Sequence, residues 1–271
     1  MTSPAEQYAA ARRRRDRPNL TDFTAGYPFA LDPFQAEACE ALEDGLGVLV
    51  CAPTGAGKTV VGEFAVHLAL AEGRKCFYTT PIKALSNQKY NDLVDRHGPG
   101  NVGLLTGDNS VNGDAPVVVM TTEVLRNMLY SGSAALEGLG YVVMDEVHYL
   151  ADRFRGAVWE EVIIHLPDDV VLTSLSATVS NAEEFAEWLV TVRGDTRVIV
   201  DEHRPVPLWQ HMQVGSRLFD LFREARGAGP GRTGRGAESA REVDPDLVRY
   251  VRDRERRSEP VRRGGRSRGW S

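Results

Sequence analysis

The sequence has 271 residues, of which 42% are hydrophobic and 26% are charged, and its formal net charge is −6. This length and apolar content are sufficient for a globular domain with a substantial core. No run approaches the roughly 18 to 20 apolar residues that a membrane span needs, and the Arg-rich N-terminus lacks the apolar segment of a secretory signal. We therefore expect a cytoplasmic protein with no membrane partner.

An N-terminal basic segment, residues 1–26, precedes a region, 27–213, in which short β-branched runs alternate with helical patterns. This alternation predicts an α/β domain, a parallel sheet with helices on both faces. The predicted strands are 48–51, 76–79, 102–105, 117–120, 141–144, 170–175 and 197–200. The predicted helices are 34–44, 58–71, 83–96, 124–130, 156–165 and 182–192.

Several residues in this region are expected to be structural. Cys39, Cys51 and Cys76 are widely separated, without a CxxC or a His pairing, so we expect buried thiols and no disulfide framework or zinc site. Trp159 and Trp188 have apolar neighbours on helical patterns, which favours packing over base stacking.

The run from residue 52 to residue 59 follows a predicted strand and opens a predicted helix, the context of a phosphate-binding loop. Gly55 and Gly57 allow backbone N–H groups to turn inward around a β-phosphate. Lys58 supplies a positive charge to the β- and γ-phosphates, and the Thr59 hydroxyl is placed to ligate Mg²⁺. The ATP-binding run is Ala52, Pro53, Thr54, Gly55, Ala56, Gly57, Lys58 and Thr59.

Asp145 and Glu146 end an apolar strand, so their carboxylates are expected at the carboxyl edge of the sheet, where ligands bind. Asp145 is suited to hold Mg²⁺, and Glu146 to orient and deprotonate the attacking water. Taken alone, acidic residues after a strand more often form a solvated turn. The phosphate loop upstream favours the catalytic interpretation.

Ser176, Ala177 and Thr178 follow the next predicted strand. The two hydroxyls can hydrogen-bond to the acidic motif and couple it to the presence of phosphate. A Ser/Thr pair at a strand end is also a common helix cap, and both interpretations stay open.

These motifs, in this order and each at a strand end, resemble those of DEAD/DExH-box superfamily 2 helicases. Residues 78–90 (YTTPIKALSNQKY), 103–108 (GLLTGD), 119–126 (VMTTEVLR) and 154–161 (FRGAVWEE) look like the Ski-two-like DExH group, which includes exosome-associated RNA helicases and actinobacterial HelY-like proteins. The resemblance covers about residues 28–212. It implies the first RecA-like P-loop NTPase domain of an RNA-directed motor that uses ATP and Mg²⁺.

Further roles come from the resemblance alone. It implies that Phe34 and Gln35 recognise adenine, and that His148 couples the ATP site to a partner domain. The predicted catalytic residues are then Lys58, Asp145, Glu146 and His148. The resemblance also implies contacts to a single-stranded nucleic acid, RNA favoured over DNA, from Thr80, Pro81, Lys83, Thr106, Gly107, Thr121 and Thr122. Such groups hold a sugar-phosphate path without reading sequence, although each isolated Thr is equally consistent with a satisfied loop hydroxyl.

Helicases of this type close two RecA-like domains around ATP, and nothing after residue 212 resembles the second. That domain, or a partner protein, would supply an arginine finger, which is worth about 10³ to 10⁵ in rate. We therefore expect this chain to be a truncated motor that binds ATP and hydrolyses it weakly or not at all. The alternatives are a non-catalytic, ATP-gated RNA-binding module and a DNA-directed helicase or translocase.

Residues 214–271 are predicted to be a Gly/Arg-rich, low-complexity and largely disordered tail, in which 246–257 have the pattern of a charged helix. Residues 216–271 hold 15 Arg against 9 Asp and Glu. Such a tail either contacts phosphates or is a solvated segment with no specific partner.

Overall fold

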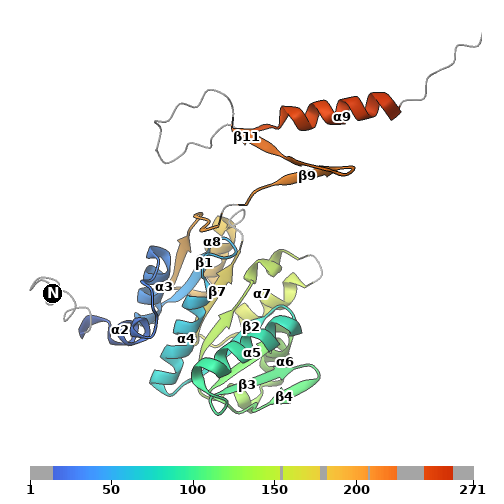
Figure 1. Cartoon of the computed structure of the whole chain (residues 1–271). Helices are drawn as coiled ribbons and strands as arrows, with labels where there is room; N and C mark the ends of the chain where they lie inside the picture. The colour runs from blue at the N-terminus through green and yellow to red at the C-terminus, as the bar shows by residue number, and fades with distance from the viewer. Residues whose placement is uncertain (1–14, 153–154, 178–181, 207, 225–240, 259–271) are drawn as a thin grey trace, which may run out of the picture. The chain divides into compact units, whose positions relative to one another are not determined.

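The computed structural model describes residues 15–152, 155–177, 182–206, 208–224 and 241–258. The chain divides into two compact units, Met1–Pro205 and Val206–Ser271 (Figure 1). The division lies ahead of the boundary at residue 213 that the sequence suggested, because β9 (His211–Val214) pairs with β10 (Arg217–Asp220) inside the second unit.

An eight-stranded sheet forms the centre of the first unit. Its strand order is β4-β3-β5-β2-β6-β7-β1-β8, and all neighbours are parallel except β3 and β4. The strands are β1 (Gly47–Cys51), β2 (Lys75–Thr80), β3 (Val102–Thr106), β4 (Asn109–Val111), β5 (Val117–Thr121), β6 (Leu139–Met144), β7 (Val171–Ser176) and β8 (Thr196–Val200).

Helices cover both faces of this sheet (Figure 1). On one face lie α2 (Pro18–Ala25), α3 (Pro33–Glu43), α4 (Thr59–Glu72) and α5 (Lys83–His97). On the other lie α6 (Thr122–Ser131), α7 (Gly156–His165), α8 (Ala182–Arg193) and the short 3₁₀ helix η2 (Val147–Ala151). A second 3₁₀ helix, η1 (Ala134–Leu136), connects α6 to β6. The predicted α/β class is confirmed.

Two apolar cores follow from the two-residue period of the strands. In β1, Val48 and Val50 face the α3–α4 side, whereas Leu49 and Cys51 face the α7–α8 side. Every residue of β6 is buried. Burial on both faces explains why these strands are continuous apolar runs without polar alternation.

The strand order sets the spacing of the motifs along the carboxyl edge of the sheet. The strands followed by the phosphate loop, the Ser176 motif and the acidic motif are β1, β7 and β6, which are direct neighbours. The strands followed by the predicted nucleic-acid residues are β2, β5 and β3, also neighbours. The two motif groups therefore occupy adjacent halves of a single edge.

The second unit contains regular structure within the region predicted as a tail. β9 (His211–Val214) pairs antiparallel with β10 (Arg217–Asp220), and β11 (Phe222–Glu224) pairs antiparallel with β12 (Arg241–Val243). The predicted charged helix is confirmed as α9 (Pro245–Ser258). Residues 225–240 and 259–271, which carry most of the Gly/Arg-rich sequence, lie outside the described residues.

The seven predicted strands and six predicted helices of the first unit are all present, with small differences at their ends. The sequence did not indicate α2, which lies within the predicted basic segment, or the exposed edge strand β4. Cys39, Cys51 and Cys76 are buried free thiols, as expected. Within the described ranges, no helix has the length and apolar character that crossing a membrane requires.

Candidate functional site

The predicted phosphate loop connects β1 to α4, as expected. Gly55 and Gly57 have φ angles of 87° and 85°, which a side-chain-bearing residue rarely adopts. A Cβ atom at Gly57 would also lie 2.6 Å from Nε2 of Gln35. Both glycines are therefore required by the backbone path. The helix that follows directs its amino end at the loop, which favours an anion there.

The start of α3 supports this loop from the side. Oε1 of Gln35 accepts a hydrogen bond from the Asp32 backbone N–H at 2.9 Å, which caps the helix. Nε2 of Gln35 donates to the Gly57 carbonyl at 3.1 Å. Phe34 is buried, and beside it a cavity of about 330 Å³ is lined by Phe34, Ala56, Asp201, His203 and Pro205, with Asp32 and Pro33. Phe34 and Gln35 thus lie next to the phosphate loop.

Lys58 is buried inside the loop. Its Nζ donates hydrogen bonds to the carbonyls of Ala52, at 2.7 Å, and Pro53, at 3.1 Å. Burial lowers the pKa of Lys58, while the charges of Glu146 and Asp145 act in the opposite direction. Neutral carbonyls compensate a buried ammonium only in part. An anion such as a phosphate would therefore be stabilised beside Lys58, although two carboxylates lie nearby.

Asp145 follows β6 and is held on two sides. The Tyr78 hydroxyl donates to its Oδ2 at 3.0 Å, and the backbone N–H of Glu146 donates to its Oδ1 at 2.9 Å. Tyr78 itself is fully buried on β2. The fixed orientation suits a carboxylate that ligates a metal, since ligating carboxylates are generally oriented by hydrogen bonds.

Glu146 has a left-handed backbone, with a φ angle of 56°, which is uncommon for a residue with a side chain. Such strain costs on the order of 1 to 3 kcal/mol and is concentrated at functional sites. Burial raises the pKa of Glu146, the charge of Asp145 raises it further, and His148 and Lys58 act against this rise. A carboxylate with a raised pKa is a better proton acceptor than a solvated one.

His148 lies on η2, with its Nδ1 3.1 Å from Oε2 of Glu146. Both atoms are buried, and neither makes an aligned hydrogen bond with any described residue. The pair is therefore held in contact without being fully satisfied. This arrangement leaves Glu146 able to exchange His148 for another donor, such as a water molecule.

Ser176 ends β7 between the loop and the acidic motif. It is buried, and its carbonyl accepts a hydrogen bond from the Ala52 backbone N–H at 3.1 Å. Ala177 is half-buried, and Thr178 lies outside the described residues. Of the three residues predicted to couple the motifs, Ser176 thus lies at the end of β7, between the strand followed by the acidic motif and the strand followed by the predicted phosphate loop.

Among the described residues, no three His, Cys, Asp or Glu side chains are grouped as a metal site. Mg²⁺ does not require such a group, because it is commonly held by one or two carboxylates together with phosphates and waters. Asp145 offers the carboxylate, and Thr59, at the start of α4, offers the hydroxyl. The donor set fits the ion.

The predicted nucleic-acid residues lie on the β3-β5-β2 half of the edge, and three of their hydroxyl groups are engaged internally. Thr80 Oγ1 lies 2.7 Å from Ser86 Oγ and donates to the Ile82 carbonyl at 3.1 Å. Thr122 Oγ1 donates to the Thr80 carbonyl at 3.4 Å, and Thr106 Oγ1 donates to Asp108 at 3.3 Å. Thr80, Thr106 and Thr122 are all buried, so their hydroxyls shape the loops.

The other predicted nucleic-acid residues on this half differ in their exposure. Lys83 is exposed and forms an ion pair with Asp108. Gly107 is exposed and Thr121 is half-buried, so both present backbone or hydroxyl groups to solvent. Pro81 is buried, and its carbonyl accepts a hydrogen bond from Arg155 at 3.5 Å.

The structure adds four residues to the site that the sequence did not assign. Tyr78 orients Asp145, Ser86 binds Thr80, Asp108 pairs with Lys83, and Arg155 reaches Pro81. All four lie inside the motif segments 78–90, 103–108 and 154–161. Their position inside these segments was the signal that the sequence offered. The partner of each side chain could not be predicted, because it depends on the order of the strands in the sheet.

The family model for DEAD/DEAH box helicases matches residues 32–185. The chain belongs to the DEAD/DEAH box helicase family. The match begins at the cap of α3 and ends in α8, so it includes the phosphate loop, Asp145 and Ser176.

Among curated proteins, the chain is 65% identical over 260 residues to a probable helicase HelY of Mycobacterium leprae, which covers 94% of this chain and 27% of the relative. It is 47% identical over 196 residues to the human exosome RNA helicase MTR4, covering 72% of this chain and 18% of the relative. The chain thus spans about a quarter or less of these relatives. These similarities confirm the Ski-two-like group of DExH helicases.

Among solved structures, the chain is similar to the DUF1998 helicase MrfA bound to DNA, with a TM-score of 0.56 and 22% identity over 68% of this chain and 29% of that one. At this identity the likeness supports the fold alone. The predicted RecA-like helicase fold is confirmed.

Proposed function

We propose that this chain is the ATP-binding motor domain of an ATP-dependent nucleic-acid helicase, directed at RNA. The observation that carries the proposal is the meeting of the phosphate loop and the acidic motif at the ends of β1 and β6. There, buried Lys58 lies within electrostatic reach of Asp145 and Glu146. ATP binds in the loop formed by residues 52–59, with its adenine beside Phe34 and Gln35.

Each residue of the nucleotide site has one task in this proposal. Backbone N–H groups around Gly55 and Gly57 bind the β-phosphate, and Lys58 leaves its carbonyl partners to contact the β- and γ-phosphates. Asp145 and Thr59 would hold Mg²⁺, which would supply positive charge to neutralise the phosphates. Glu146 accepts the proton of the attacking water, and its contact with His148 is the route by which a closing partner domain is sensed.

The nucleic acid lies along the other half of the edge. Lys83, Gly107, Thr121 and the loop backbone at Pro81 contact its phosphates, while Thr80, Thr106 and Thr122 fix the loops that present those groups. RNA is favoured because relatives at 47% to 50% identity are named RNA helicases. Contacts to phosphates do not select the sugar, so a DNA-directed helicase or translocase is the alternative.

The activity of this chain on its own is expected to be weak. Its described residues contain one sheet of this type, and family members close a second RecA-like domain over the nucleotide to supply an arginine finger. Without that group the rate of phosphoryl transfer falls by about 10³ to 10⁵. A non-catalytic, ATP-gated RNA-binding module is therefore the other candidate, because such a module needs bound ATP but no arginine finger.

The deciding experiment measures steady-state phosphate release with ATP and Mg²⁺, alone and with single-stranded RNA or DNA of equal length. Slow release that RNA stimulates more than DNA supports the proposal. Equal stimulation by DNA favours the translocase alternative, and ATP binding with no turnover favours the gated module. If ATP does not bind at all, the assignment of the nucleotide site is wrong.

A further inference from the structure

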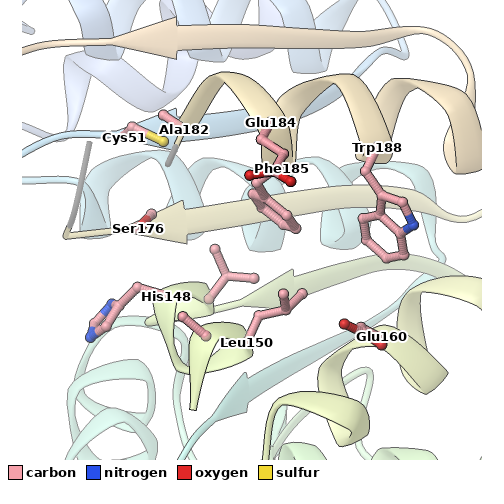
Figure 2. Close-up of a pocket in the computed structure, with 11 residues that line it drawn as sticks. Cys51, His148, Leu150, Glu160, Ser176, Ala182, Glu184, Phe185 and Trp188 are labelled. Carbon is pink, nitrogen blue, oxygen red and sulfur yellow. The ribbon is translucent and has the colours of Figure 1, made fainter. Parts of the chain in front are cut away.

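A cavity of about 330 Å³ lies behind the acidic motif, between η2, α7 and α8 (Figure 2). None of the predicted roles for ATP or nucleic acid uses its apolar walls. The residues that line it include His148, Glu160, Ser176, Glu184, Phe185 and Trp188. Its volume is within the range of about 300 to 1,000 Å³ that small-molecule sites occupy.

The walls of this cavity are suited to a planar ring. Phe185 and Trp188 lie one helical turn apart on α8, with ring centroids 5.9 Å apart and planes at 25°. Figure 2 shows both rings extending from α8 towards Leu150 and Glu160 on the opposite side. Unlike Trp159, which is fully buried, Trp188 stays partly exposed. Covering exposed aromatic surface of this kind with another ring lowers the free energy of the complex.

Two carboxylates are among the described residues that line the cavity. Glu160 from α7 and Glu184 from α8 are exposed, and neither forms an ion pair with a described residue. Among the described residues that line it there is no Lys or Arg. Two unpaired carboxylates beside aromatic rings favour a cation, because both the charges and the ring faces attract it.

We propose that this cavity is a binding site for a small aromatic cation, a planar ring bearing an ammonium group. The ring packs against Phe185 and Trp188, and the carboxylates of Glu160 on α7 and Glu184 on α8 attract the ammonium group. A phenyl or naphthyl ring with one methylene to the nitrogen has the size and charge that these groups recognise.

The site also touches the nucleotide machinery, since His148 and Ser176 form part of its wall. A ligand there restrains η2 relative to β7, and so shifts the affinity for nucleotide. This second step rests on the proposed function, whereas binding of the cation does not.

The test uses three matched probes: 1-naphthylmethylammonium, the neutral 1-naphthalenemethanol and the anionic 1-naphthoate. Binding is followed by NMR on the indole N–H of Trp188, assigned by its loss in Trp188→Phe, without nucleotide present. The cation should bind about two- to fivefold more tightly than the alcohol, the range expected for exposed ion pairs, and the anion should bind weakest. Equal affinities, or no shift of the Trp188 signal, would overturn the proposal.

Variants locate the effect. The double variant Glu160→Gln, Glu184→Gln should remove the preference for the cation and leave the alcohol unaffected, whereas Glu187→Gln, on the same helix but outside the lining, should change neither. Ala151→Trp, at an exposed lining position, should weaken all three probes by filling the cavity. A cation preference that survives the double variant would contradict the site.

The link to nucleotide is tested separately, by the affinity for a fluorescent ATP analogue with and without saturating cation. A shift in that affinity, absent in Ala151→Trp, supports the link. If the cation binds as described and the affinity is unchanged, the link is wrong and the site stands. If the analogue does not bind even without cation, the proposed function fails and the NMR result is unaffected.

Discussion

The two halves of the sheet edge are built differently. On the β6-β7-β1 half, charged groups have incomplete partners: buried Lys58 hydrogen-bonds only to carbonyls, and half-buried Glu146 touches His148 without an aligned hydrogen bond. On the β3-β5-β2 half, the buried polar groups are hydroxyls such as those of Thr80 and Thr122, and each has a partner within the loops.

This difference indicates that the β6-β7-β1 half is suited to bind and hydrolyse a ligand, whereas the buried hydroxyls of the β3-β5-β2 half hold its loops in shape. A buried charge without full compensation costs stability, so its retention indicates that a ligand completes it. A buried hydroxyl with a partner is stable as it is and holds a loop in shape. Substitutions on the first half should therefore change nucleotide binding and turnover by large factors, and those on the second half should change nucleic-acid affinity by small ones.

The largest effect is expected for Glu146→Gln. The amide keeps the size of the side chain and removes the proton acceptor, so hydrolysis should fall by about 10²- to 10⁴-fold. ATP affinity should stay within about threefold, because the phosphates do not contact this group. Single-turnover phosphate release and a nucleotide-binding titration measure the two quantities. Glu161→Gln, which alters a surface ion pair with Arg126, is the matched control. Unchanged turnover in Glu146→Gln would remove Glu146 from the mechanism.

Lys58→Ala should weaken ATP binding by about 10- to 100-fold, as expected when a charge-assisted hydrogen bond to phosphate is lost. The measurement is a fluorescence titration with a nucleotide analogue and Mg²⁺. Lys75→Ala removes an equal charge at the amino end of β2, where Nζ donates to the Ala135 carbonyl, and should leave ATP affinity unchanged. Equal losses in both variants would mean that net charge, and not the loop, binds the nucleotide.

The contrast between the halves also explains what the sequence could predict. The phosphate loop and the acidic motif are local patterns, in which Gly57, Lys58 and Asp145 are identified by near neighbours in the chain. The strands were predictable because β6 and β1 are buried on both faces and are therefore apolar throughout. No local sequence pattern links Tyr78 to Asp145, since their hydrogen bond depends on β2 lying beside β6.

The elements that the sequence missed lack such local signals. β4 is three exposed residues at the edge of the sheet, without an apolar alternation to mark it. α2 buries only Phe23, so most of its length has no core-facing pattern. The strands β10 to β12 are likewise short and largely exposed, within a region whose composition is that of a tail. Helix α9 was predictable because its charges have a helical period.

Lys83 gives the third prediction, on the nucleic-acid half. Lys83→Ala should weaken binding of single-stranded RNA by about three- to tenfold and reduce the slope of log affinity against log salt by about 0.7, the value for one phosphate contact on a single strand. Asp108→Asn should have the opposite effect on affinity, because Asp108 now pairs with Lys83 and repels phosphate. Fluorescence anisotropy at several salt concentrations measures both. Lys89→Ala, which breaks the Lys89–Asp92 contact on the same helix, is the control, and an equal effect there would argue against a specific path.

The smallest effect is expected far from this edge, at two histidines on α4 and α5. Burial lowers the pKa of His67 and of His97, so the folded protein binds their protons less readily than the unfolded chain does. Stability from these groups is therefore fully present above the ordinary His pKa of about 6.5 and is lost as the pH falls below it.

Thermal melts between pH 7.5 and about 5.5 should show a modest fall in Tm, and His67→Gln with His97→Asn should reduce that fall. At a temperature well below Tm, ATP affinity should change with pH in the same way in the variant and the parent, because these side chains have no part in the proposed nucleotide site. An acid-dependent loss of ATP affinity that the double variant abolishes would contradict this expectation. It would show that half-buried titratable groups outside the carboxyl edge also affect nucleotide binding, so the functional charged groups would not be confined to the β6-β7-β1 half of that edge.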